Sequence, residues 1–208
     1  MRVTSQSFEH GLAIPGEFAF AVPDPDTHVR LSDNRNPHLA WSDVPEGTQS
    51  FVISIIDDDV PTRPDDVNQE GREVPAELAR CEFVHWLICD LDPAVREIAA
   101  GSCAEGVQPH GKQEPTGPHG SVQGENDYTG WFAGDTDMSG SYRGYDGPCP
   151  PWNDSLVHHY HHTVYALSVP SLNLAPGFGL TELRQAMEGK VLASATLVGT
   201  YTLNPRLR

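Results

Sequence analysis

The chain is organised around Phe51-Val52-Ile53-Ser54-Ile55-Ile56-Asp57, which is apolar on both alternating faces except at Ser54 and the final Asp57. Side chains alternate between the two faces of a strand, so such a run is typical of a strand buried on both sides. We therefore predict a central strand over residues 51–57. Two further apolar runs predict neighbouring strands: Phe83–Asp90, which carries His85 in its interior, and the run from the histidine cluster His158–His162 to Ser168.

The C-terminal part predicts one helix and one more strand. Thr181 can cap the helix and Gly189 marks its end. The last apolar run, Leu192–Leu203, is predicted to return as a strand through the sheet. The apolar face of the helix would carry Leu183, Ala186 and Met187.

Length and composition favour a globular, loop-rich β protein. The 208 residues can bury a sizeable core, and nothing in that length requires more than one domain, so residues 1–208 are interpreted as one. Hydrophobic residues make up 38% and charged residues 20%, while 19 Gly and 18 Pro predict many turns.

The charge of the chain limits its partners. Thirteen basic residues against 29 acidic ones give a formal charge of −16, which repels nucleic acids and anionic lipid surfaces. Residues 1–6 lack the apolar run of a signal peptide, and no stretch approaches the roughly 20 apolar residues that cross a bilayer. We expect a cytoplasmic protein with no nucleic-acid partner and no membrane insertion, in which any anion is held by a local cluster of donors.

The four cysteines show no C-x-x-C spacing, which argues against a zinc knuckle or a thioredoxin-like motif. Free thiols are expected. If Cys81 and Cys89 share one strand, they lie roughly 26 Å apart and cannot form a disulfide within it. The cysteines are Cys81, Cys89, Cys103 and Cys149.

Two stretches lack periodicity, residues 62–80 and residues 101–153. Loops of this length in a compact domain are usually functional or poorly ordered. Part of the second stretch is predicted to pack against the domain, because a solvated linker rarely carries so many aromatic residues. Residues 110–124 have no such anchors and are predicted to be mobile. The aromatic residues are Trp131, Phe132, Tyr142, Tyr145 and Trp152.

The histidine cluster concentrates titratable donors on one strand. In an extended strand His158, Tyr160 and His162 share one side, and His159 and His161 share the other. One side can then line a pocket, where imidazolium and phenol groups suit phosphate or carboxylate oxygens. The alternative is an exposed edge strand.

Asp57 and His85 are candidates for the same pocket. Asp57 leaves the core at the end of an apolar strand and can accept hydrogen bonds, although Asp57–Pro61 is also typical of a plain turn. His85 should be buried, which disfavours its protonated form unless an acid stabilises it. The alternative is a core histidine that is hydrogen-bonded for structural reasons alone.

Two other kinds of site are less favoured. A zinc or iron site could use His158, His162, His85 and Asp57, but no H-E-x-x-H or similar spacing fixes the ligand geometry. No G-x-S-x-G elbow or recognisable catalytic cysteine is present. We therefore expect no metal, no cofactor and no enzymatic activity.

Several segments resemble the phosphatidylethanolamine-binding proteins, in particular their bacterial branch, often called Raf kinase inhibitor-like proteins. Pro45–Phe51 followed by Asp57–Pro61 is similar to the family's P-E-G-T-x-S-F and D-P-D-x-P. Val84–Ile88 resembles its H-W strand, and Gly144–Pro151 resembles its G-Y-x-G-P-C-P-P loop. The tail Ala186–Ala193, running on to Gly199-Thr200-Tyr201, is similar to the bacterial ending.

The resemblance implies a mainly β fold, with antiparallel sheets in a Greek-key-like β-sandwich and a few short peripheral helices. It also implies a small pocket for a phosphate-like anion or a phosphorylated head group. Carried over residue by residue, the ligand-binding positions are Asp57, Pro61, His85, Pro151, His158 and Tyr160.

This chain departs from the family pattern in four places. His159 replaces the family's arginine and Asp58 replaces a proline. The spacing from Pro151 to His158 is one residue longer than usual, and a long loop insertion covers about 101–142.

The favoured hypothesis is a binding protein in which His85 and His158 donate to an anion, Tyr160 adds a hydroxyl and Asp57 orients one imidazole. The proline residues Pro61 and Pro151 would stiffen the rim of the pocket. One alternative is a hydrolase that uses the same His and Asp groups for acid–base chemistry. Another is an interaction module that regulates a partner kinase or protease through the insertion, by analogy with the family name alone. A homodimer is also left open.

Overall fold

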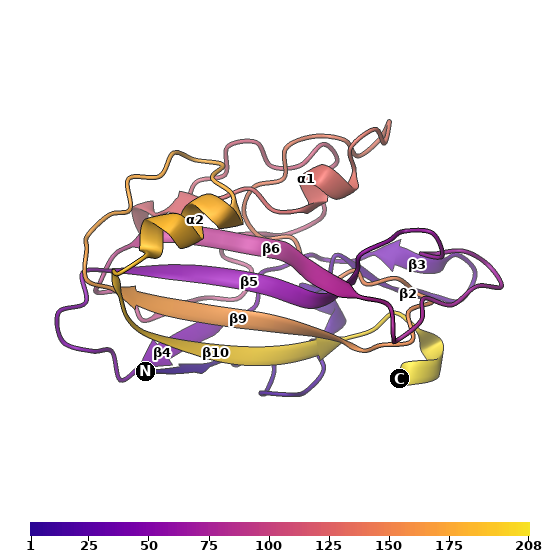
Figure 1. Ribbon diagram of the computed structural model, residues 1–208, viewed down its shortest axis with the longest axis horizontal. Helices are drawn as coiled ribbons and strands as arrows, with labels where there is room; N and C mark the ends of the chain where they lie inside the picture. The colour runs from indigo at the N-terminus through magenta and orange to yellow at the C-terminus, as the bar shows by residue number, and fades with distance from the viewer.

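A five-stranded antiparallel sheet with the order β10-β9-β5-β6-β8 forms the centre of the protein (Figure 1). The computed structural model describes residues 1–208. β5 lies in the middle of this sheet, which confirms the predicted central strand, although the strand runs on to Pro61. The strands are β5 (Ser50–Pro61), β6 (Arg80–Leu91), β8 (Val122–Gln123), β9 (His158–Leu167) and β10 (Val191–Tyr201).

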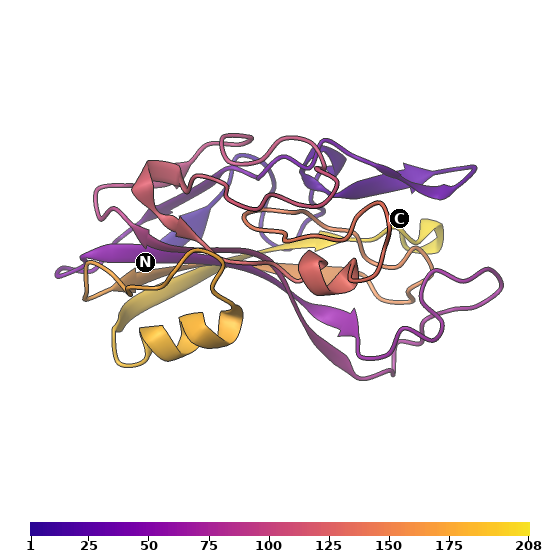
Figure 2. The ribbon, with the colours of Figure 1, turned by 90° about the horizontal axis from the view of Figure 1, so that it is seen from above.

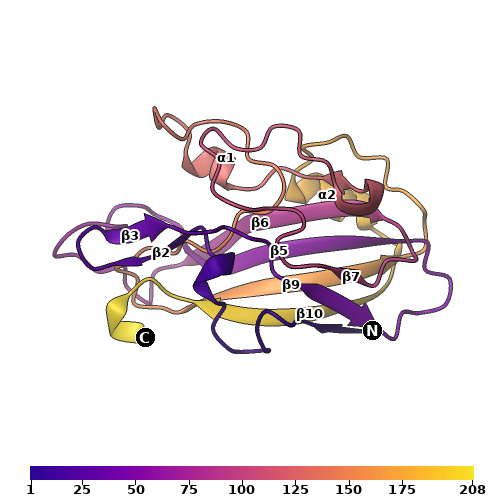
Figure 3. The same ribbon diagram turned by 180° about the vertical axis from the view of Figure 1, so that it is seen from behind.

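Two layers cover the faces of this sheet. A three-stranded sheet, β1 (Arg2–Thr4), β4 (Leu39–Ser42) and β7 (Glu97–Ile98), lies over one face (Figure 3). Helix α2 (Leu180–Met187) lies on the opposite face (Figure 2). A hairpin of β2 (Ala21–Asp24) and β3 (His28–Leu31) extends from one end of the molecule. The predicted mainly β, antiparallel sandwich is confirmed.

The remaining helical elements are short. They are the four-residue α1 (Tyr128–Trp131) and three 3₁₀ turns, η1 (Gly16–Phe18), η2 (Pro118–Gly120) and η3 (Pro205–Leu207). None of the helices has the length and apolar character that crossing a bilayer requires.

The two-faced burial of β5 explains its sequence. Phe51, Ile53 and Ile55 point into the larger core, between the two sheets, and are at most 1% exposed. Val52 points the other way, into a smaller core that it shares with Leu183 of α2. Because both faces are covered, an uninterrupted apolar run is needed where a half-exposed strand would alternate.

Helix α2 begins one residue before the predicted cap. Its N-cap is Gly179, whose backbone N–H donates to the Glu182 carboxylate at 2.9 Å, so the prediction that Thr181 caps the helix is wrong. The predicted apolar face is confirmed, since Leu183 and Met187 are buried. The predicted C-terminal strand corresponds to β10.

The nonperiodic stretch of residues 101–153 makes more contacts with the rest of the domain than predicted. Tyr142 and Tyr145 are buried as expected, whereas Trp131 is 49% exposed. Residues 110–124 were predicted to be mobile because they carry no aromatic anchor, but they do make polar contacts with the rest of the domain. The ammonium group of Lys112 donates to the Asp146 carboxylate at 2.8 Å, and Gln123 pairs with β6 and accepts a hydrogen bond from the Trp86 indole at 2.7 Å. These anchors are polar, so a search for aromatic residues misses them.

All four cysteines are free. Cys81 and Cys89 both lie on β6, the arrangement in which they cannot form a disulfide with each other.

Candidate functional site

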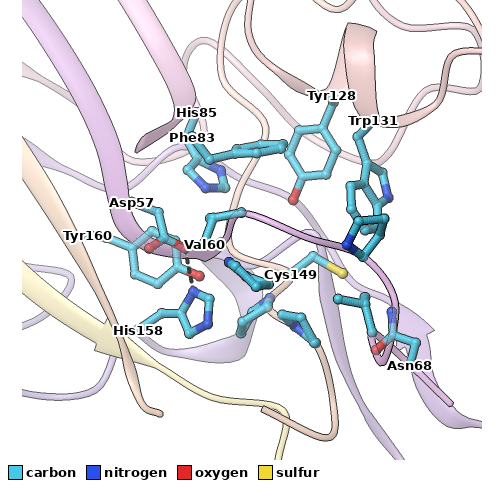
Figure 4. Close-up of a pocket in the computed structure, with 15 residues that line it drawn as sticks. Asp57, Val60, Asn68, Phe83, His85, Tyr128, Trp131, Cys149, His158 and Tyr160 are labelled. Atoms are coloured by element: carbon cyan, nitrogen blue, oxygen red, sulfur yellow. Dashed lines mark hydrogen bonds and ion pairs between the residues drawn. The ribbon is translucent and has the colours of Figure 1, made fainter. Parts of the chain in front are cut away.

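A cavity of about 250 Å³ lies where the C-terminal end of β5 meets the first halves of β6 and β9 (Figure 4). The structure brings all six predicted ligand-binding residues to its lining: Asp57, Pro61, His85, Pro151, His158 and Tyr160. It adds nine residues that were not predicted, namely Val60, Pro64, Val67, Asn68, Phe83, Tyr128, Trp131, Cys149 and Pro150.

A bulge in β5 turns side chains from the end of this strand toward the cavity. The register between β5 and β6 shifts between Asp57 and Val60, and the Asp59 N–H donates to Asp57 Oδ1 at 2.9 Å. Pairing then continues to Pro61, opposite Arg80. The alternative of a plain turn is therefore wrong, because the bulge lets one strand present both a carboxylate and a proline to the same cavity.

The alternation predicted for β9 is confirmed. His158 and Tyr160 face inward and are at most 1% exposed, whereas His159 and His161 face solvent and bind Asp59 and Asp58. β9 lies between β10 and β5, so the edge-strand alternative is wrong.

His162 also faces inward, but it lies in the core beyond the cavity. Its ring packs 5.0 Å from Phe8, and Nδ1 donates to the Tyr160 carbonyl at 3.0 Å. Burial lowers the pKa of His162 to about 4, so it is neutral. With His162 outside the cavity, the four groups weighed as metal ligands do not converge.

His158 is clamped between two carboxylates. Nδ1 lies 2.7 Å from Asp57 Oδ2, and Nε2 lies 3.1 Å from Asp154 Oδ2. Burial disfavours the charged ring, but the hydrogen bonds and negative charges of Asp154 and Asp57 outweigh it and raise the His158 pKa to about 9. His158 is thus an imidazolium at neutral pH whose two N–H groups are both already used.

Arg80 completes this cluster. Its guanidinium makes a two-pronged contact with Asp154, at 2.6 and 3.1 Å, and also donates to the Asp59 carbonyl at 2.8 Å. Burial opposes the charge of Asp154, yet the hydrogen bonds from His158 and Arg80 prevail and lower its pKa. We call Arg80, Asp154, His158 and Asp57 the charge network; it contains two cations and two carboxylates.

His85 has the opposite protonation. Its Nδ1 lies 2.8 Å from the Asp146 carbonyl oxygen, which can only accept, so Nδ1 carries the proton. Burial lowers the pKa of His85 despite the nearby charge of Asp57. The ring is therefore neutral, and its Nε2 presents a lone pair that no protein group uses. Asp146 is itself fixed by Lys112, Asn34 and Asn126.

Tyr160 offers the second unused polar group. Its ring centroid lies 5.2 Å from that of His85, and its hydroxyl is buried without a hydrogen-bond partner. Burial, and then the charge of Asp57, raise the pKa of Tyr160 well above its ordinary value. The phenol keeps its proton and can donate it to a ligand.

The wall opposite these polar groups is mainly apolar (Figure 4). Trp131 and Tyr128 come from α1, and the Tyr128 hydroxyl donates to the Gly147 carbonyl at 2.7 Å. Burial raises the pKa of the Cys149 thiol to about 12, so it is not a thiolate at neutral pH.

Asn153 holds the loop of residues 62–80 against this wall. Its amide nitrogen donates to the carbonyls of Asp66, Gln69 and Arg72, and its amide oxygen accepts from the Asn68 N–H at 2.9 Å. The nonperiodic stretch 62–80 is thus an ordered part of the cavity.

Arg80 and Asp154 are the most consequential residues that the sequence did not single out. Asp154 lies between Pro151 and His158, and the only hint of its role in the sequence was that this segment is one residue longer than in the family pattern. Nothing in the sequence hinted at the role of Arg80, because this residue ends a stretch without periodicity and lies 74 positions from its partner Asp154.

A sequence profile described as phosphatidylethanolamine-binding protein matches residues 4–202. The chain belongs to this family. A protein called UPF0098 from Aquifex aeolicus is 32% identical over 203 residues, covering 97% of this chain and 88% of that one. YbhB of Escherichia coli, also a UPF0098 protein, is 27% identical over 202 residues, covering 97% and 100%.

Solved structures agree with this assignment. A phosphatidylethanolamine-binding protein homologue from Chlamydia trachomatis has a TM-score of 0.64 and 28% identity, covering 96% of this chain and 95% of that one. YbcL of Escherichia coli has a TM-score of 0.67 at 24% identity, covering 97% of each chain, and supports the fold alone. The resemblance to the bacterial-type branch is confirmed.

Proposed function

We propose that this protein binds a small molecule through an oxyacid group, such as the phosphate of a phosphorylated head group, in the cavity between His85 and Tyr160. One observation carries the proposal: two buried polar groups, an imidazole acceptor and a phenol donor, face the same cavity without a protein partner. Buried polar groups are normally hydrogen-bonded, so unused ones at a cavity mark where a ligand would supply the partner. Membership of a family described as phosphatidylethanolamine-binding supports this choice.

The roles of the two histidines differ in this proposal. His85 and Tyr160 contact the ligand, while the charge network fixes the floor of the cavity. His158 cannot donate to a ligand without giving up a carboxylate, so it acts as a positioning residue together with Asp57. Pro61 and Pro151 contribute rigid parts of the rim.

We propose binding without turnover. Cys149 is a thiol with a pKa of about 12, which makes it a poor nucleophile. His158 is already protonated and doubly hydrogen-bonded, so it does not serve as a general base. A cytoplasmic location, a homodimer, and regulation of a partner kinase or protease through residues 101–142 stay predictions.

Calorimetric titration with inorganic phosphate, acetate and phosphoethanolamine tests the proposal. Tyr160→Phe removes only an unpaired hydroxyl, so the fold should survive and affinity should fall about 3- to 10-fold, the value of one hydrogen bond. Tyr142→Phe removes a buried hydroxyl away from the cavity and serves as the control. If Tyr160→Phe and His85→Ala bind every probe as tightly as the parent, the site assignment is wrong.

A further inference from the structure

We infer that this cavity takes its ligand as a singly ionised phosphate monoester, with one proton held between a ligand oxygen and His85 Nε2 and an apolar substituent against the Trp131 wall. The inference rests on the proposed function and narrows its ligand class. Three features carry it: the balance of charge at the cavity, the hydrogen-bonding state of His85, and the apolar lining.

No unpaired cation faces the cavity. The two positive charges of the charge network, on Arg80 and His158, are matched by the carboxylates of Asp154 and Asp57. Lys112, the next buried cation, is bound to Asp146. A ligand with two negative charges would be desolvated here without a counter-charge, and this cost grows steeply with charge.

The hydrogen bond of His85 calls for a ligand with a proton. Its Nδ1–H is used by the Asp146 carbonyl, so the only free atom is the Nε2 lone pair. An ionised oxygen opposite this lone pair would be repelled. A monoester monoanion keeps one P–OH that can donate to Nε2, while another oxygen accepts from the Tyr160 hydroxyl.

The groups around His85 keep this arrangement in place. Asp57 is bound to His158, Asp146 to Lys112, and Asp127 accepts a hydrogen bond from the Val84 N–H at 2.7 Å. Their negative charges disfavour a second negative charge on the ligand. The titratable groups that face His85 are Asp57 on β5, Asp127 and Tyr128 at α1, Asp146 in its loop, and Tyr160 and His162 on β9.

The apolar lining gives the ligand its second feature. The polar groups occupy one side of the cavity, and Figure 4 shows Trp131 on the other. Inorganic phosphate would leave that side unused, whereas a phenyl or alkyl substituent would cover it. The apolar members of the lining are Val60, Pro61, Pro64, Val67, Phe83, Trp131, Pro150 and Pro151.

Calorimetry with three compounds from pH 5 to 9 tests the inference: phenyl phosphate, phenylphosphonate and methyl phenyl phosphate. Affinity for phenyl phosphate should fall about tenfold per pH unit above its second pKa, near 6, because the proton must be taken up again. Phenylphosphonate has a higher second pKa, so its decline should begin at a correspondingly higher pH. The diester methyl phenyl phosphate has one charge but no proton to donate, and should bind at least tenfold more weakly at pH 5.

Two variants locate the substituent. Trp131→Ala should weaken phenyl phosphate several-fold and leave inorganic phosphate unchanged, because only the former reaches that wall. Leu12→Ala, at another exposed apolar residue, is the matched control.

The possible outcomes separate this inference from the proposed function. If the phosphate and the phosphonate lose affinity over the same pH range, or if the diester binds as well as the monoester, the inference is overturned while the proposed site stands. If none of the three binds, the inference is overturned, and the proposed function falls with it only if inorganic phosphate, acetate and phosphoethanolamine also fail to bind. Loss that tracks the second pKa of each ligand supports the inference.

Discussion

Replacing Asp154 by asparagine tests whether His158 is held as an imidazolium by two carboxylates. The substitution keeps the size of the side chain but removes its charge, leaving Asp57 as the single anionic partner of His158. It also leaves Arg80, whose side chain is 11% exposed, without its carboxylate. Breaking a buried pair in this way costs about 3 kcal/mol of unfolding free energy near neutral pH.

The pH dependence makes the test specific. The rise of the His158 pKa from 6.5 to about 9 corresponds to about 3 kcal/mol of stabilisation. Because the pKa is higher in the folded state, this stabilisation is fully present below pH 6.5 and is lost as pH rises through 9. With one of two carboxylates removed, we expect the variant to retain about half of it.

Urea denaturation at pH 6.5, 7.5, 8.5 and 9.5 measures both effects. The difference in stability between parent and variant should narrow by about 1.5 kcal/mol over this range. Asp58→Asn is the matched control, because Asp58 also pairs with a histidine, His161, but in an exposed position where the contribution is small. Curves for the parent and Asp154→Asn that run parallel from pH 6.5 to 9.5 would refute the assignment.

Two further predictions concern parts of the fold that support the cavity. Lys112→Met should lower the free energy of unfolding, measured by urea denaturation, by about 3 kcal/mol, because it leaves the buried carboxylate of Asp146 without its cation. Arg184→Met removes one partner of an exposed ion pair and should lower it by less than about 1 kcal/mol. Equal losses would contradict the buried role of Lys112. Gly147→Ala should lower the stability measured by thermal denaturation by about 1–3 kcal/mol, because the new methyl group would clash with the Phe18 carbonyl oxygen. Gly130→Ala is the control, because its methyl group would meet no atom within contact distance. An unchanged melting temperature for Gly147→Ala would show that this loop can move aside.

The sequence predicted those parts of the fold in which burial produces a regular pattern of residues along a strand. β5 is covered on both faces, so its run is almost entirely apolar, and the first half of β9 is exposed on alternate residues because only one of its sides is solvated. The same periodicity placed His158 and Tyr160 on a common side. The ends of the strands were predicted less accurately, because the bulge after Asp57 depends on pairing with β6 and has no signature in the local sequence.

The pairing of polar groups could not be predicted in the same way. Lys112 contacts Asp146 from 34 positions away, and Arg80 contacts Asp154 from 74. A charged residue in a loop is normally solvated, so nothing in its neighbours indicates a buried partner. These contacts nevertheless decide which donors at the cavity are available.

The two cavity histidines show why this matters for function. Both were expected to donate to an anion, and both are buried, on the strands β6 and β9 that flank β5. One carbonyl oxygen on Nδ1 leaves His85 neutral with a free lone pair, whereas two carboxylates make His158 a cation with no free N–H. The hydrogen-bonding capacity of a histidine in such a motif therefore follows from the partners of both ring nitrogens, and the contact with Asp154 takes up the one N–H of His158 that Asp57 leaves free.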